Sequence, residues 1–106
     1  MYDAFGILAD PTRRGIVEVL RGGERSVGEI VESVAISQPG VSRHLGILLE
    51  AGFVELRPDG RRRLYRLRPE PFRELEAWLG GYRELWEGRL DRLTAALTTA
   101  DEGERR

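Results

Sequence analysis

The segment from Ser37 to Ala51 constrains the fold of this chain more than any other part of the sequence. Ser37 is a residue type that caps helix N-termini, and Pro39 falls in the first turn, where a missing N–H group costs nothing. At about 100° per residue, the larger apolar side chains share one face: Val41, Leu45, Leu48 and Leu49. The segment therefore predicts an amphipathic helix that packs on a core through that face.

The start of this predicted helix carries hydrogen-bond donors and acceptors that do not belong to the apolar face. The second helix of a helix-turn-helix contacts DNA base edges with residues near its N-terminus. Arginine pairs with guanine and glutamine with adenine, each through two hydrogen bonds. We therefore expect base contacts from four residues, the alternative being a solvated surface: Gln38, Ser42, Arg43 and His44. Ser37 is expected to cap the helix and to lie near a phosphate.

The residues before Ser37 predict the first helix of such a pair. Ser26 and Glu29 have the spacing of a capping box, and the helix that follows turns Ile30, Val31 and Val34 inward. This helix is expected to end near 35–36, only two or three residues before the Ser37 cap. Such a tight connection predicts a helix-turn-helix over residues 26–51.

Two further helices are expected at the N-terminus, over residues 2–9 and from Pro11 to the Gly22-Gly23 pair, with Asp10 as the cap of the second. Arg13 and Arg14 lie at the start of the second helix, where positive charge opposes the helix dipole. Contacts with DNA phosphates would offset that cost. Salt bridges to Asp10 or Glu18 are an equally good explanation.

After Gly52 the hydrophobic period changes towards two, which predicts strands over 53–57 and 63–67 around a Pro58-Asp59-Gly60 turn. This hairpin, the wing of a winged helix, covers residues 53–67, and its tip holds Arg61, Arg62 and Arg63. We expect these arginines to contact phosphates or the minor groove. The alternative is a turn whose charges only increase solubility.

The distribution of charge supports a polyanion partner, although the net charge of the chain is only −1. Residues 57–68 contain six arginines and one aspartate, a local excess of five positive charges, whereas each flank has a net charge of −3. One basic strip on an acidic body is an electrostatic footprint for phosphate.

From residue 71 to about 99 the pattern is helical, and such a helix spans roughly 40 Å, longer than a globule of this size is wide. It needs a second copy of the chain to cover its apolar face. We expect a homodimer whose interface is formed by the first and last helices: Tyr2, Phe5, Leu8, Leu75, Trp78, Leu79, Tyr82, Trp86, Leu90 and Leu93. Gly80-Gly81 predicts a kink or a close helix crossing, and residues 100–106 a frayed tail.

Several functional classes lack the residues that they require. The chain has no cysteine and one histidine, so it offers neither a thiolate site nor enough imidazoles for a metal. No nucleophile with a base, phosphate loop or long apolar run is present, so we expect no enzyme, no cofactor and no membrane contact, and a cytoplasmic location. A ligand pocket formed by Trp78, Tyr82, Leu85 and Trp86 is left open, although such aromatic spacing more often reflects packing.

Several strings occur together and resemble the arsenic-repressor (ArsR) family of dimeric winged-helix transcription regulators. The resemblance covers residues 2–98 and rests on these strings: Leu8 to Arg14, Val27 to Ile30, Ile36 to Pro39, Val41 to Leu45, Leu49 to Val54, and Gly60 to Arg63 with Tyr65 and Leu67. It implies a recognition helix over 38–51 and a homodimer that binds an operator and usually represses. Many relatives sense metals through residues that this chain lacks, which implies a metal-independent member.

We therefore expect one winged helix-turn-helix domain over residues 1–99, mainly helical with a small β-hairpin. Its expected partners are double-stranded operator DNA and a second copy, with a small-molecule effector left open. The expected function is repression of transcription from a pseudo-palindromic operator. A winged helix that binds protein without specific DNA binding is the alternative.

Overall fold

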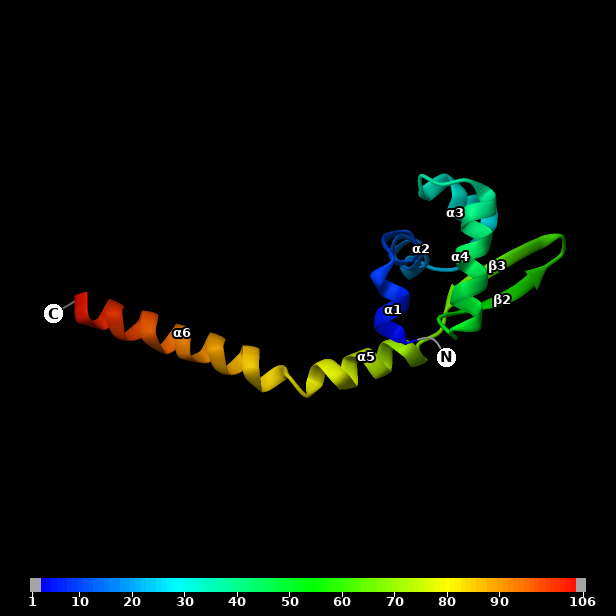
Figure 1. Cartoon of the computed structure of the whole chain (residues 1–106). Helices are drawn as coiled ribbons and strands as arrows, with labels where there is room; N and C mark the ends of the chain where they lie inside the picture. Colours follow the sequence, from blue (N-terminus) through cyan, green and yellow to red (C-terminus); the bar gives the residue numbers. More distant parts are fainter. Residues whose placement is uncertain (1–2, 105–106) are drawn as a thin grey trace. The chain divides into compact units, whose positions relative to one another are not determined.

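The computed structural model describes residues 3–104, except for the side chains of residues 90, 91 and 99–104. The chain divides into two compact units between Arg73 and Glu74. Figure 1 shows the elements in chain order, with these bounds: α1 Ala4–Ala9, α2 Pro11–Arg21, β1 Arg25–Ser26, α3 Val27–Ser33, α4 Gln38–Glu50, β2 Val54–Asp59, β3 Arg62–Leu67, α5 Glu70–Gly80 and α6 Arg83–Glu104.

The predicted start signals are present at the helices of the first unit. The Asp10 side chain accepts a hydrogen bond of 3.0 Å from the backbone N–H of Arg13, and Pro11 occupies the first turn of α2. Ser26 and Glu29 form both hydrogen bonds of the capping box at the start of α3. These local bonds satisfy N–H groups that a helix cannot pair internally, so the two helices begin where the sequence predicts.

One core joins the helices and the two longer strands of the first unit. Its fully buried side chains come from α1, α2, α3, α4 and the segment that enters the hairpin: Ile7, Ile16, Leu20, Ile30, Val41, Leu45, Leu48, Phe53 and Val54. The rings of Phe72 and Phe53 pack edge-to-face with their centroids 5.6 Å apart, and this contact connects the start of α5 to the core. The face of α4 that carries Val41, Leu45 and Leu48 therefore packs inward, as predicted.

The wing is a three-stranded antiparallel sheet with the strand order β1-β3-β2. The sequence predicts only two of these strands, because β1 is a two-residue segment that carries no periodic signal. The turn is also shorter than predicted: Asp59 pairs with Arg62, and Gly60 has a φ of +62°. Glycine at the first central position is typical of two-residue type II′ hairpins. Pro58 therefore lies in β2, an edge strand, where proline is tolerated.

The turn between α3 and α4 also differs from its prediction. Helix α3 ends at Ser33, about two residues earlier than expected, because Val34 adopts an extended conformation with φ −118° and ψ 148°. Residues 34–37 then connect the two helices. The helix-turn-helix arrangement is as predicted, with a slightly longer connection.

The predicted single helix over 71–99 is two helices. α5 ends at Gly80 and α6 begins at Arg83. The ring of Trp78 in α5 contacts the ring of Tyr82, which lies within the break, and the ring centroids are 4.7 Å apart. Adjacent glycines weaken a helix, and the expected kink is this interruption. α6 extends to Glu104, so it includes residues that the sequence predicts to form a frayed tail.

The second unit leaves most of its described apolar side chains in contact with solvent. Seven large hydrophobic residues on α5, α6 and the segment between them are at least 42% exposed: Trp78, Leu79, Tyr82, Leu85, Trp86, Leu93 and Leu97. Within the described part of the chain, no helix is both long enough and apolar enough to cross a membrane.

Candidate nucleic-acid interface

Helix α4 has two chemically distinct faces. Val41, Leu45 and Leu48 are fully buried, whereas Gln38, Ser42 and Arg43 are exposed. The exposed side chains are those predicted to read bases, and they lie near the N-terminal end of a helix of 13 residues. No ion pair in the described residues involves Arg43, so its guanidinium is available to a ligand.

The burial of His44 does not fit the predicted contact with a DNA base edge. Its side chain is only 7% exposed, and its Nδ1 atom is buried without a hydrogen bond from any described residue. His44 lies three residues after Val41 and one before Leu45, and this spacing turns the ring towards the apolar face. We therefore place His44 in the core and remove it from the predicted base-contacting set.

Ser37 occupies the N-cap position of α4, as predicted, but its side chain forms no capping hydrogen bond. Its backbone carbonyl accepts from the N–H of Val41 at 3.0 Å, which begins the helix. The exposed Ser37 hydroxyl is therefore not engaged by the helix start.

Arg13 and Arg14 bind the C-terminal end of α1. Arg13 donates from Nε to the Ile7 carbonyl at 3.0 Å and from a terminal nitrogen to the Gly6 carbonyl at 3.2 Å. Arg14 donates to the Leu8 carbonyl at 3.1 Å. The last carbonyls of a helix lack internal partners and carry partial negative charge, which explains why two cations are tolerated here.

The surroundings of Arg13 do not fit the predicted contact with a DNA phosphate. Its side chain is 18% exposed and also approaches the Asp10 carboxylate at 3.9 Å, the salt bridge that the sequence left as an alternative. The backbone N–H of Arg13, which donates to Asp10, is the main cause that lowers the pKa of this carboxyl from its ordinary value of 3.8. Arg13 thus fastens α1 to α2, while the exposed Arg14 is still a candidate for phosphate contact.

The arginines of the wing are all exposed but differ in their partners. Arg57 binds Glu24 through two hydrogen bonds of 2.8 and 3.2 Å, and this interaction lowers the pKa of Glu24 and raises that of Arg57. Arg62 binds Glu29 of α3 at 3.0 Å, and Arg66 binds Glu55 on the neighbouring strand. Among the described residues, Arg61 and Arg63 form no ion pair.

These acidic partners are features that the sequence reasoning missed. Glu24 and Glu29 lie far from the wing in sequence, and the fold brings them to it because β1 pairs with β3 and α3 follows β1 directly. The only available sequence signal was the assignment of Glu29 to a capping box. The basic strip is therefore partly neutralised within the protein itself.

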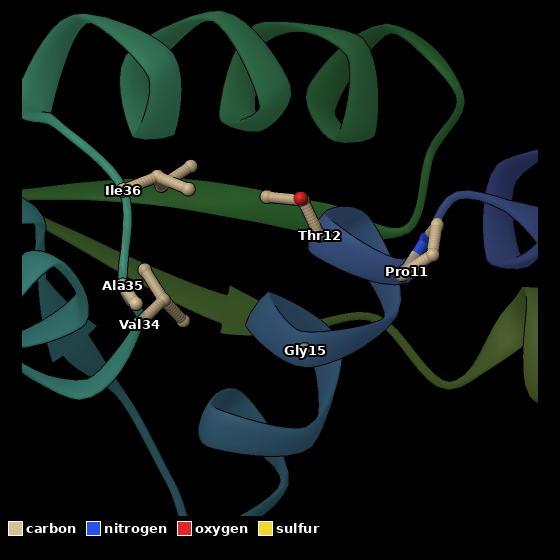
Figure 2. Close-up of a pocket in the computed structure, with 6 residues that line it drawn as sticks. All are labelled: Pro11, Thr12, Gly15, Val34, Ala35 and Ile36. Atoms are coloured by element: carbon tan, nitrogen blue, oxygen red, sulfur yellow. The ribbon is translucent and has the colours of Figure 1, made fainter.

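A pocket of about 390 Å³ lies between the start of α2 and the connection from α3 to α4 (Figure 2). Figure 2 shows the side chains of Thr12 and Ile36 pointing towards each other across it. Among the described residues that line this pocket, none is charged and Thr12 has the only polar side chain. The pocket therefore offers a ligand one hydroxyl group and no charged side chain among the described residues.

The geometry excludes some kinds of metal site within the described residues. No group of three or more histidine, cysteine, aspartate or glutamate side chains there is arranged to hold a metal ion. The chain has no cysteine anywhere, so a thiolate site is not available to it.

A helix-turn-helix followed by a basic β-hairpin defines the class of winged helix-turn-helix proteins. Residues 10–55 match the model of the family described as bacterial regulatory protein, arsR family. The transcriptional repressor SdpR of Bacillus subtilis is 34% identical over 79 residues, which are 74% of this chain and 88% of that protein. The chain belongs to the arsR family.

Two further comparisons agree with this assignment. The HTH-type transcriptional regulator Rv2034 of Mycobacterium tuberculosis is 48% identical over 66 residues, which cover 62% of this chain and 62% of that protein. The solution structure of the homodimeric winged helix-turn-helix DNA-binding domain of Mb0332 from Mycobacterium bovis has a TM-score of 0.63 and 28% identity, and the match covers 80% of each chain. The relatives are transcriptional regulators and not enzymes.

Proposed function

We propose that this chain binds double-stranded DNA as a homodimer and represses transcription from a pseudo-palindromic operator. Its membership of the arsR family and its similarity to a transcriptional repressor support a regulatory role. The two copies of α4 would enter successive major grooves roughly 34 Å apart.

The observation that carries this proposal is the exposed face of α4. Three side chains that can recognise base edges, Gln38, Ser42 and Arg43, are exposed on a helix whose other face is buried in the core. A rigidly packed helix can position such groups, and each bidentate pair with a base contributes about 1–3 kcal/mol of discrimination. We assign base contacts to these three residues.

Phosphate contacts are assigned to residues around this helix. Arg61, Arg62 and Arg63 on the wing, with Ser37 and Arg14, are exposed and can reach a polyanion. Such contacts position a protein on DNA without reading its sequence, and they make binding depend steeply on salt. Arg61 and Arg63 should contribute most, since neither is ion-paired with a described residue.

The dimer interface is assigned to the exposed apolar residues of α5 and α6, together with Phe5 and Leu8 of α1. Trp78, Leu79, Tyr82, Trp86 and Leu93 are each at least 42% exposed, and the Mb0332 domain, a relative of the same fold, is homodimeric. The half-buried Leu75 belongs to the same surface. Tyr2 and the side chain of Leu90, also predicted for this interface, lie outside the described residues.

We infer that thiolate-bound metal does not control this regulator, because it has no cysteine. The proposal does not specify whether a small-molecule effector binds this chain. Such an effector can be sought by the shift in thermal midpoint that a bound ligand causes.

The decisive experiment selects duplexes from a random pool on the purified protein at low and moderate salt. An enriched inverted repeat, with sedimentation of the protein as a dimer, would support the proposal. Enrichment of no repeat, or a monomer at micromolar concentration that binds no duplex, would overturn it.

One observation favours the alternative of a winged helix that binds protein. Three of the wing arginines already have carboxylate partners within the chain, Glu24, Glu29 and Glu55, which lowers the net charge offered to DNA. This alternative predicts no steep dependence of duplex affinity on salt. The same selection and a salt titration on random DNA therefore separate the two functions.

A further inference from the structure

Two of the three arginine–glutamate pairs formed by the wing arginines differ in strength. Arg57 and Glu24 share two hydrogen bonds, and the Glu24 side chain is 27% exposed. Arg62 and Glu29 share one hydrogen bond of 3.0 Å, and their side chains are 59% and 47% exposed. A bidentate arginine–carboxylate pair is geometrically specific, whereas an exposed pair with one contact is weak and is screened by salt. Arg62 can therefore exchange its partner more readily than Arg57.

Glu29 is held in place by a second interaction that does not involve Arg62. Its Oε1 atom accepts from the backbone N–H of Ser26 at 3.0 Å, as part of the capping box of α3. This hydrogen bond is the main cause that lowers the pKa of Glu29 from its ordinary value of 4.5. The carboxylate therefore remains charged and fixed at the start of α3, whether or not Arg62 is bound to it.

We propose that Glu29 competes with DNA phosphate for Arg62 and thereby limits the part of the affinity that does not depend on base sequence. A phosphate that binds Arg62 must displace a carboxylate that the capping box keeps nearby, and this carboxylate repels the phosphate. Arg61 and Arg63 have no such competitor among the described residues. This inference rests on the proposed DNA binding and makes Glu29 a positioning residue for the wing.

The test is Glu29→Gln, because a glutamine at this position can still accept the capping hydrogen bond but carries no charge. Glu32→Gln is the matched control: it removes the same charge from the same helix, where Glu32 is exposed and forms no ion pair in the described residues. Affinity for a random duplex is measured by fluorescence anisotropy between roughly 50 and 200 mM salt, and far-UV circular dichroism verifies folding.

We expect Glu29→Gln to bind the random duplex more tightly and with a steeper salt dependence. The salt slope is the decrease in the logarithm of the affinity per unit increase in the logarithm of salt concentration, and one additional phosphate contact adds about 0.9 to it. Over this fourfold range of salt, the variant should therefore lose about 3.5-fold more affinity for each wing than the unmodified chain. Glu32→Gln should leave the slope nearly unchanged. In an Arg62→Ala background, the effect of Glu29→Gln should disappear, because the competed side chain is absent.

Equal slopes for the two glutamine variants, or an effect that persists without Arg62, would overturn the inference while leaving the proposed function intact. Failure of the unmodified chain to bind any duplex would overturn both. Arg62→Gln and Arg63→Gln give a second test that leaves α3 unchanged. The inference requires the loss of Arg63 to weaken binding more than the loss of Arg62, and the reverse order would contradict it.

Discussion

The two units of this chain differ in how far their apolar side chains are buried. Up to Arg73, most of the large hydrophobic side chains are buried together, and Ile16, Leu45 and Leu48 have no exposed surface, although Phe5 and Leu56 are exposed. From Glu74 onward, the apolar side chains of α5 and α6 are exposed, with Leu85 at 60% and Leu97 at 63%. The first unit thus has a core of its own. The second has an exposed apolar surface, to which we assign the contact with a second copy.

The two proposed functions, DNA binding and dimerisation, are assigned to different units. Residues 3–73 contain the groups assigned to DNA, on a helix and a hairpin supported by packing. Residues 74–104 contribute the surface assigned to a second copy. Changes in the first unit should therefore affect folding or DNA binding in each subunit, whereas the effects of changes in the second unit should depend on protein concentration.

The largest expected effect is the loss of stability on truncating the core. Leu45→Ala should lower the free energy of unfolding by about 2–5 kcal/mol, because it leaves a cavity under α4. Leu97→Ala is the matched change at an exposed position of α6. Urea unfolding followed by circular dichroism at several protein concentrations measures both. An equal loss for the two variants would contradict the contrast between the units.

The next effect concerns the proposed dimer. Trp86→Asp places a charge in the assigned interface, and it should raise the dimer dissociation constant by at least about 100-fold, since buried aromatic residues often dominate interface energies. Sedimentation velocity measures the change, and Glu84→Gln on the same helix is the control. The first unit should retain its circular dichroism. A variant that is still fully dimeric at low micromolar concentration would remove Trp86 from the interface.

A smaller effect distinguishes two neighbours on α4. Arg43→Ala should lower affinity for the selected duplex by about 1–3 kcal/mol and relax base preference, because Arg43 is exposed. His44→Leu should leave base preference unchanged, because the His44 ring lies in the core. Competition with duplexes substituted at single base pairs measures both. Relaxed preference in a folded His44→Leu protein would restore His44 to the reading surface.

The smallest expected effect is the dependence of stability on pH. The pKa values of Asp10 and Glu24 are lowered in the folded state from ordinary values of 3.8 and 4.5. Their stabilisation is therefore fully present above those ordinary values and is lost as the pH falls through the lower folded-state values. Thermal midpoints between about pH 3 and pH 7 should fall at the acidic end. Glu24→Gln should flatten this fall, and an unchanged profile would remove Glu24 as a contributor.

Local signals predicted most of the helices and the hairpin. Asp10-Pro11 and the Ser26–Glu29 capping box mark helix starts through hydrogen bonds within a few residues, so the sequence contains all of the atoms involved. Gly80-Gly81 predicted a kink or a close helix crossing within one helix, and the structure has a break there, because adjacent glycines weaken a helix. β1 was not predicted, because a two-residue strand exists only through its pairing with β3.

The exposed side chains of the candidate site could be predicted from the sequence, but the hydrogen-bond and ion-pair partners of its arginines could not. The exposed positions of Gln38, Ser42 and Arg43 follow from helical periodicity together with the position of the apolar face. The burial of His44 was missed because a histidine near the border of that face suits either side. The roles of Arg13 and Arg62 depend on the carbonyls of α1 and on Glu29, which sequence spacing alone could not assign to them.

The sequence by itself determined where most helices begin, which face of α4 is apolar and where positive charge concentrates, because these properties depend on neighbours along the chain. Only the tertiary structure decided that His44 joins the core, that Arg13 fastens α1 and that Glu24 and Glu29 bind arginines of the wing. The physical reason is that burial and ion pairing depend on which distant segments meet in space. That arrangement follows from packing around one core and from the pairing of β1 with β3.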